Sequence, residues 1–318
     1  MCKEVGYTST EVGLDCNNCQ VLQKVEAQDA NIAAAVHGTG EKKDEDLGAG
    51  DQGLMFGYAT DEWDTETLFP YSHYLANKIC EVMAEKRHSG EISWLRPDCK
   101  SQVIVEYEKI GSDLKPKSIY NVLISTQHDP SVDNATIQKV LTELIKTLAP
   151  ADWLKDTKYV INPSGKFDRG GPAADAGLTG RKIIVDTYGG WAPHGGGAFS
   201  GKDPSKVDRS AAYYGRYVAK SLVHNKLCHR ALVQVSYAIG LADPLSIHVE
   251  SYGTVKEGLT DDDLVRIVRN NFSFRPGNII KELDLLRPIY QKTAKYGHFG
   301  RTDKDFTWET PKENLKLD

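Results

Sequence analysis

Apolar side chains recur every three or four residues in three stretches of the chain, which is the spacing of one buried face of an α-helix. The first two stretches occupy residues 72–90 and 137–150. The third opens with a capping box of Thr260 and Asp263, and we expect Pro276 to end it. We therefore predict three helices whose apolar stripes face the core. The stripe positions are Leu75, Ile79, Val82 and Met83, then Ile137, Val140, Leu141, Leu144, Ile145 and Leu148, and finally Leu264, Ile267 and Val268.

Five other stretches are rich in Val, Ile and Tyr and alternate in part between apolar and polar residues, which indicates β-strands. They occupy residues 102–107, 120–126, 181–188, 230–239 and 246–252. Several strands follow one another, and the helices come between them irregularly. This order favours an α+β fold over a doubly wound sheet, in which strands and helices alternate.

The composition narrows the class of protein. The 318 residues are 40% hydrophobic and 26% charged, which is typical of a globular chain and excludes the disordered, collagen-like and membrane classes. No apolar run approaches the ~20 residues of a membrane helix, so we expect no membrane partner. The net charge of -5 argues against nucleic acid as a partner. The length allows two or three domains.

Six cysteines are scattered along the chain, and only Cys16 and Cys19 have the spacing of a metal-binding pair. One such pair without a second is weak evidence for a metal. Free thiols in a reducing compartment explain the scattered cysteines better, so we expect a cytoplasmic protein. The acidic, lysine-bearing stretch at 41–46 is expected to be a solvated loop.

The densest glycine clusters lie between residues 165 and 201, and one of them has the sequence HGGGAFSGKD at 194–203. It has the glycine and lysine spacing of a Walker A loop, but Asp203 stands where a P-loop NTPase needs Ser or Thr for Mg²⁺. Glycine still lets backbone N–H groups approach an anion, and Lys202 adds a positive charge. We predict a phosphate-binding loop of another type; the alternative is a flexible loop with exposed lysines. The supporting residues are Arg181, Lys182, Lys206 and Arg209, with Asp208 as a candidate magnesium ligand.

Two further glycine-rich segments carry candidate binding residues. The segment GAGDQGLMFGY at 48–58 surrounds Asp51 with glycines, which suits presentation of its carboxylate to a cation or a substrate amine. A simple turn between strands is the alternative. In the segment 162–182, Phe167 precedes a glycine turn and can stack on a base, while Asp175 can bind a polar group. Burial of Phe167 in the core is the alternative there.

Taken together, these segments resemble the methionine adenosyltransferase family, also called S-adenosylmethionine synthetase. The resemblance extends over residues 5–308, with several long motifs in the family's order. The motifs are GAGDQG at 48–53, WLRPDCK at 94–100, residues 177–190, residues 195–208, QVSYAIG at 234–240 and YGHFG at 296–300.

The resemblance implies an enzyme that forms S-adenosylmethionine from ATP and L-methionine. In the family the methionine sulfur attacks C5′ of the ribose, and the triphosphate that leaves is cleaved to pyrophosphate and phosphate at the same site. The resemblance also implies Mg²⁺ and K⁺ as cofactors, and a homodimer or dimer of dimers with active sites between subunits. The implied α+β fold consists of similar, intertwined units of mixed sheet with helices on one face.

The resemblance assigns site residues position by position. The catalytic residues that it implies are Asp51, Lys100, Arg181, Lys182, Lys202 and Lys206. The ATP contacts that it implies are Asp98, Lys100, Ser164, Phe167, Asp175, Arg181, Lys182, Ala198, Lys202 and Lys206. The methionine contacts are Gln28, Asp175, Lys206 and Ile239, and the magnesium ligand is Asp208.

Some features depart from the family pattern. We expect the chain to lack the family's N-terminal segment with its His-Pro-Asp-Lys motif, and the His128-Asp129-Pro130 sequence between a strand and a helix is no substitute. The segment 28–35 has alanines in place of a proline and a glycine, which raises its helix propensity. The charged pair Asp168-Arg169 replaces an apolar pair after Phe167, and Ala174 replaces a glycine.

These departures leave two classes of function open. The first is a working methionine adenosyltransferase, which the surviving phosphate-site cations favour. The second is a non-catalytic or regulatory paralogue that assembles with an intact family member, which the missing motif favours; residual triphosphatase activity is a third alternative. We favour the enzyme. The predicted domains are a remnant of an N-terminal domain at 1–45, a central domain at 46–168 and a C-terminal domain at 169–318.

Overall fold

The computed structural model describes residues 1–38 and 46–317, so nearly all of the predicted solvated loop at 41–46 lies outside the described residues. The chain forms two compact units, each assembled from separate segments. Within the described ranges, no helix has both the length and the apolar character needed to span a membrane. Unit 1 comprises Met1–Val25, Tyr71–Glu108 and Lys115–Leu178, and unit 2 comprises Glu26–Pro70, Lys109–Leu114 and Thr179–Asp318.

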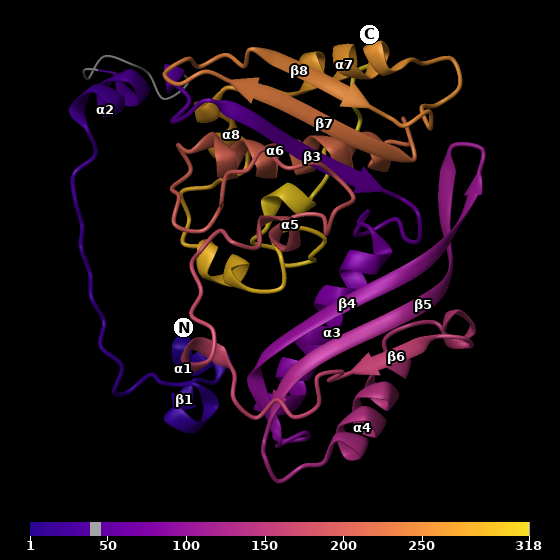
Figure 1. The fold of residues 1–318 in the computed structure, drawn as a ribbon. Helices are drawn as coiled ribbons and strands as arrows, with labels where there is room; N and C mark the ends of the chain where they lie inside the picture. The colour runs from indigo at the N-terminus through magenta and orange to yellow at the C-terminus, as the bar shows by residue number, and fades with distance from the viewer. Residues whose placement is uncertain (39–45, 318) are drawn as a thin grey trace. The chain divides into compact units, whose positions relative to one another are not determined.

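Unit 1 is built on a sheet with the strand order β4-β5-β6, in which β6 runs parallel to β5 (Figure 1). The apolar stripes at 75–83 and 137–145 are largely buried, which confirms the first two predicted helices. Asp133 caps the second of these helices by accepting a hydrogen bond from the Thr136 N–H. The elements are α3 (Tyr71–His88), β4 (Leu95–Ile110), β5 (Asp113–His128), α4 (Asn134–Lys146) and β6 (Lys158–Ile161).

The N-terminal part of unit 1 consists of short elements. Arg87, near the end of α3, donates a hydrogen bond to the Val5 carbonyl at 2.7 Å and so ties this part to the unit. The short elements are α1 (Cys2–Val5), β1 (Thr8–Ser9), a 3-10 helix at Thr10–Val12 and β2 (Leu14–Asp15), with further 3-10 helices at Ala151–Leu154 and Gly171–Ala173.

Unit 2 contains an antiparallel sheet with the strand order β3-β7-β8. Helix α6 packs against β3 and β7 at very short range, because glycines face each other at the contact. A methyl group on Gly57 of β3 would lie 1.9 Å from the carbonyl carbon of Gly215 in α6, so no side chain fits there. The elements are β3 (Gly53–Thr60), α6 (Val207–His224), β7 (Arg230–Tyr237) and β8 (Ser246–Glu250).

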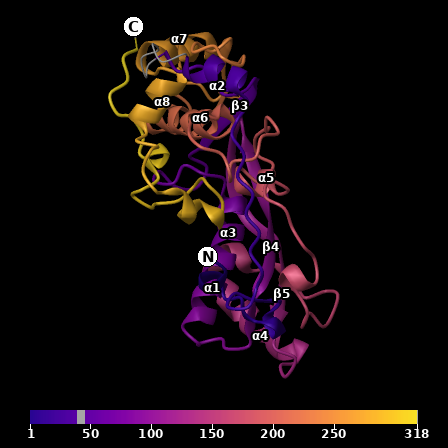
Figure 2. The same cartoon turned by 90° about the vertical axis from the view of Figure 1, so that its left-hand side faces the viewer.

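The other helices of unit 2 complete its helical layer. Figure 2 shows α6, α7 and α8 on the same side of β3. Thr260 and Asp263 form the predicted capping box at the start of α7. Sheets and helices in this order confirm the predicted α+β class. The remaining elements are α2 (Ala30–His37), α5 (Ile183–Asp186), α7 (Asp261–Asn271), α8 (Pro276–Glu282) and 3-10 helices at Tyr290–Ala294 and Thr307–Glu309.

The predicted strand at 181–188 is wrong, because this segment forms the helical turn α5 instead. The Thr187 hydroxyl donates to the Ile183 carbonyl at 2.9 Å, and the Gly189 N–H donates to the Ile184 carbonyl at 2.8 Å. Val and Ile favour a strand where a neighbouring strand offers packing, whereas here Ile184 is 40% exposed. Arg181 and Lys182 therefore precede a helical turn and do not open a strand.

The end of the third predicted helix also needs correction. Helix α7 ends at Asn271, and Pro276 starts α8. Proline suits the first position of a helix because its missing N–H would have no partner there and its φ is already helical. A proline after an apolar stripe thus marks the next helix here.

A buried ion pair lies at the centre of unit 2. Arg216 of α6 is fully buried, and its guanidinium donates to the two carboxylate oxygens of Glu309 at 3.1 and 2.8 Å. Its other N–H groups donate to the carbonyls of Tyr58, Thr67 and Leu68 at 2.6 to 2.8 Å. One side chain therefore joins β3, the turn before α3 and the C-terminal segment.

Glu309 has two more partners. Lys220 donates to it at 3.0 Å, and the Gly300 N–H donates to it at 2.8 Å. Burial raises the pKa of Glu309, but the charges of Arg216 and Lys220 outweigh burial and hold the pKa below its usual value. The carboxylate is therefore ionised in the folded protein.

Replacing Arg216 with Met should destabilise the protein by about 3–5 kcal/mol, because Glu309 would stay buried without its main partner. The matched control is Lys146→Met, which removes an exposed ion pair with Glu143 and should cost at most about 0.5 kcal/mol. Denaturant unfolding of both variants measures the difference. Equal losses would contradict the central role of Arg216.

Candidate functional site

The predicted phosphate-binding loop lies in unit 2 between α5 and α6. Two of its glycines leave no space for a side chain. A methyl group on Gly195 would lie 1.7 Å from the Leu54 carbonyl oxygen in β3. A methyl group on Gly197 would lie 2.1 Å from the carboxylate carbon of Asp208 in α6. The loop is therefore held tightly against both elements and has a defined path.

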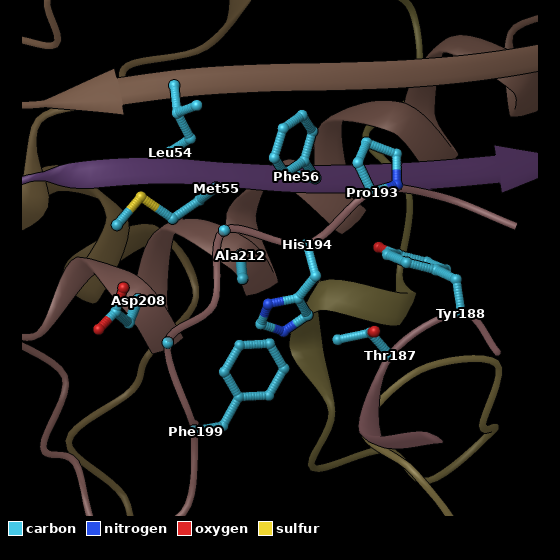
Figure 3. A pocket seen from close by; sticks show the side chains of 12 residues that line it. Leu54, Met55, Phe56, Thr187, Tyr188, Pro193, His194, Phe199, Asp208 and Ala212 are labelled. Atoms are coloured by element: carbon cyan, nitrogen blue, oxygen red, sulfur yellow. The ribbon is translucent and has the colours of Figure 1, made fainter. Parts of the chain in front are cut away.

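His194 fixes the loop from within, a role that the sequence did not predict. Its Nδ1 accepts a hydrogen bond from the Gly196 N–H at 2.8 Å, and its ring lies beside the Phe199 ring, with the centroids 5.8 Å apart (Figure 3). Burial lowers the pKa of His194, Asp208 opposes this effect, and Lys202 reinforces it. The cavity between these side chains measures about 10 Å³, which is room for one water molecule at most.

Lys202, at the end of the loop, forms an ion pair with Asp208 in the first turn of α6. The Lys202 side chain is 29% exposed and that of Asp208 is 16% exposed, so both groups can be reached from solvent. Lys202, the candidate phosphate-binding cation, is thus neutralised by Asp208, the candidate magnesium ligand. A polyphosphate that binds Lys202 and a cation that binds Asp208 can take the place of this pair.

The backbone of Lys202 is held by Arg209, which the sequence placed only among the nearby charges. Arg209 is buried and donates to the Lys202 carbonyl at 3.0 Å, to the Tyr213 hydroxyl at 3.1 Å and to the Thr293 hydroxyl at 3.0 Å. The Tyr213 hydroxyl lies 2.7 Å from Nδ1 of His298, whose pKa burial lowers to about 3. A buried chain of polar groups therefore links the YGHFG segment to the loop.

The glycine-rich turn at 48–53 lies beside the segment that follows the loop. The Gly50 N–H donates to the Ser205 carbonyl at 3.2 Å, and the Gly240 N–H donates to the Ala49 carbonyl at 2.8 Å. The residues that form these bonds are adjacent in sequence to predicted site residues: Gly50 precedes Asp51, Ser205 precedes Lys206, and Gly240 follows Ile239. Unit 2 therefore brings together the segments that carry Asp51, Lys206 and Ile239.

In unit 1, Phe167 lies beside Asp98 and two glycines. Asp98 accepts from the Gly171 N–H at 2.8 Å, and a methyl group on Gly170 would lie 2.9 Å from the Phe167 ring. Nε2 of His128 accepts a hydrogen bond from the Phe167 N–H at 3.0 Å, and the backbone N–H of His128 donates to the Phe167 carbonyl at 3.0 Å. The sequence alone assigns no role to His128. Phe167 is half-buried and sits outside any strand, with its backbone held on both sides.

An open cavity of about 500 Å³ lies next to this turn in unit 1. Arg96 and Asp129 form an ion pair of 2.5 Å in its wall. The charged pair Asp168-Arg169 also lines it. The cavity wall therefore carries charged groups of both signs.

The predicted site residues are divided between the two units. Asp98, Lys100, Ser164, Phe167 and Asp175 belong to unit 1, and the others belong to unit 2. The loop residue Ala198 is half-buried against Gly180, where a methyl group would lie 2.5 Å from its Cβ. The predicted residues with exposed side chains are Gln28, Asp51, Lys100, Ser164, Asp175, Arg181, Lys182 and Ile239.

Metal ligands are sparse in the structure. Among residues 1–38 and 46–317, no three side chains of His, Cys, Asp or Glu gather where they could hold a metal ion. Asp208 is thus a single carboxylate, which fits a magnesium ion bound to a polyphosphate, since Mg²⁺ commonly takes one or two carboxylates and substrate phosphates.

Two family models match the chain over adjacent ranges. Residues 46–167 match S-adenosylmethionine synthetase, central domain, and residues 169–310 match S-adenosylmethionine synthetase, C-terminal domain. The chain belongs to the S-adenosylmethionine synthetase family. The glycine loop, Lys202 and Asp208 all lie in the C-terminal-domain match.

In this member of the family, Gly197→Ala should loosen the loop because the new methyl group collides with the Asp208 carboxylate. Overpacking of about 1–3 kcal/mol should speed amide hydrogen exchange over residues 194–203 by roughly tenfold or more. Gly177→Ala is the matched control, since nothing lies within 4 Å of its Cβ position. Unchanged exchange in the Gly197 variant would contradict the tight contact.

Proposed function

We propose that this chain is a methionine adenosyltransferase, which forms S-adenosylmethionine from ATP and L-methionine. The observation that carries the proposal is the Lys202–Asp208 ion pair at the end of a tightly held glycine loop, in a chain of this family. This arrangement suits a phosphate site that is formed before its ligand arrives. The loop backbone is already in place, and on binding the Lys202 side chain exchanges Asp208 for a phosphate.

The reaction that we propose demands mainly position and positive charge. A lone pair on the methionine sulfur forms a bond to C5′ of the ATP ribose, while the C5′–O bond breaks and its electron pair leaves with the triphosphate. The thioether carries no proton, so no general base has to act on it. Catalysis rests on alignment and on cations that stabilise the leaving oxygens. The cations that we assign to the phosphates are Lys100, Arg181, Lys182, Lys202 and Lys206, with Ala198 in the loop beside them.

We assign the remaining groups by the same proposal. Phe167 and Ser164 form the adenine side, with Asp98 holding the turn next to them, and Asp175 contacts both substrates. Gln28, Lys206 and Ile239 lie on the methionine side, and Asp51 is presented by its glycine-rich turn as a catalytic carboxylate. Asp208 and the phosphates would hold magnesium, which would neutralise charge on the triphosphate. We draw no step through potassium.

The assembly and location of the enzyme belong to the same proposal. We propose a homodimer, or a dimer of such dimers, with active sites between subunits, and a location in the cytoplasm. The domain boundaries after residues 45 and 168 remain predictions.

A paralogue without catalytic activity, assembled with an intact family member, is the second candidate. Helix α2 favours it. The Asp29 carboxylate caps this helix by accepting from the Asn31 N–H at 2.9 Å and the Ile32 N–H at 3.3 Å. The segment after Gln28 is therefore helical, in line with its alanine content, and a helix restricts how this segment can close over a substrate.

Incubation of the purified chain with ATP, L-methionine, Mg²⁺ and K⁺ should yield S-adenosylmethionine, detected by mass spectrometry. Lys202→Met should lower kcat by on the order of 10²–10³, because it removes a preorganised charge from the leaving group. Lys155→Met is the matched control, since Lys155 is 71% exposed and pairs only with Asp152 on the surface.

Two results would contradict the proposal. A folded wild-type chain that forms no S-adenosylmethionine would exclude the enzyme for this chain as written. Co-purification of such an inactive chain with an active family member would support the paralogue. Equal activity of the Lys202 variant and the control would exclude the assigned role of the loop.

A further inference from the structure

Two cysteine side chains meet between α3 and β4 in unit 1. Cys80 lies on α3 and Cys99 lies on β4, two residues before Ser101, whose hydroxyl contacts the Cys80 sulfur. Ser101, the next residue after Cys99 on the same face of β4, fixes the contact between β4 and α3. The Ser101 hydroxyl lies 3.2 Å from the Cys80 sulfur and donates to the Ala76 carbonyl of α3 at 2.5 Å.

The two thiols differ in acidity. The hydrogen bond with Cys99 is the main cause that lowers the pKa of Cys80. The same bond, followed by burial, raises the pKa of Cys99. Cys80 is therefore the thiol that ionises first and attacks an oxidant, and Cys99 is positioned to react with it next.

Cys228, Cys16 and Cys19 lack this combination of features. Cys228 is buried in unit 2, and burial raises the pKa of its thiol. Cys16 and Cys19 lie three residues apart in one segment, where the Cys19 thiol contacts the Cys16 carbonyl at 3.7 Å. A disulfide between Cys80 and Cys99 would instead join two packed elements that are distant in sequence.

We propose that Cys80 and Cys99 form a reversible dithiol–disulfide site, with a peroxide as the oxidant. The Cys80 thiolate attacks one oxygen of hydrogen peroxide, the O–O bond breaks, and hydroxide leaves, which converts Cys80 to a sulfenic acid. The Cys99 sulfur then attacks the Cys80 sulfur, and the sulfenic oxygen leaves as water. Two thiols and one peroxide thus become one disulfide and two waters, and a dithiol reductant reverses the change.

The site has a defined place next to the proposed nucleotide residues. Cys99 lies between Asp98, which holds the Gly171 N–H, and Lys100. A change in the oxidation state of Cys99 therefore takes place on the strand that carries both Asp98 and Lys100. The proposal itself does not depend on catalysis, because the bond can be observed directly.

Tryptic mapping of the full chain tests the proposal, because the two candidate pairs give different products. Trypsin releases Cys80 in the peptide 79–86 and Cys99 in the peptide 88–100, whereas Cys16 and Cys19 remain within the single peptide 4–24. After brief treatment of the native protein with hydrogen peroxide and alkylation, we expect peptides 79–86 and 88–100 to be cross-linked. Dithiothreitol added before alkylation should abolish the link.

Two serine variants separate the proposed pair from general oxidation. Cys80→Ser should leave Cys99 open to alkylation after peroxide treatment, and the double variant Cys16→Ser with Cys19→Ser should keep the cross-link. Absence of the cross-link in the native wild-type chain would overturn the proposal. A link that forms only after denaturation would overturn it as well.

Discussion

The fold of unit 2 depends on one buried guanidinium. Every N–H of the Arg216 side chain has an acceptor: two are the Glu309 carboxylate oxygens and three are backbone carbonyls from the end of β3 and the turn before α3. A buried charge is tolerated only when it is paired and hydrogen-bonded to this extent. The same helix carries Asp208 and Arg209 at its N-terminal end. The pair that fixes α6 in the core therefore also fixes the place where the glycine loop ends.

The glycine loop and α6 together account for the proposed chemistry. Glycines let the loop approach Leu54 and Asp208 more closely than any other residue allows, and Arg209 holds the carbonyl of Lys202. The charged end of Lys202 is the movable part, and Asp208 neutralises it. When a polyphosphate binds with its cation, the Lys202–Asp208 pair is replaced by two pairs, Lys202 with a phosphate and Asp208 with the cation. The charges at the site are therefore paired both with and without a ligand.

Much of this site could be predicted from the sequence. The spacing of glycines, Lys202 and Asp208 identified the loop, and the matched family models agree with the resemblance. The contacts of the supporting groups could not be predicted, although the sequence places Arg209 among the charged residues beside the loop. His194, Arg209 and His128 act through contacts with backbone groups, and His128 contacts a residue 39 positions away. Spacing and charge in the sequence do not show which backbone carbonyl or N–H a side chain will hold.

The errors in secondary structure have a similar origin. The β-branched residues at 181–188 have high strand propensity, but a strand needs a neighbour, and the following glycines close a helical turn instead. Proline breaks helices, so the sequence predicts that Pro276 ends one, although proline begins a helix equally well. In both segments, the outcome depends on what surrounds the residues.

The central claim is that Asp208 holds Lys202 until an anion and its cation replace the pair. Calorimetric titration of inorganic triphosphate into the wild-type chain and Asp208→Asn, without and with Mg²⁺, tests it most directly. Without Mg²⁺, the variant should bind triphosphate several-fold more tightly than wild type, because Lys202 is released. Adding Mg²⁺ should then improve binding by the wild type far more than by the variant. Weaker or unchanged binding by the variant without Mg²⁺ would contradict the account.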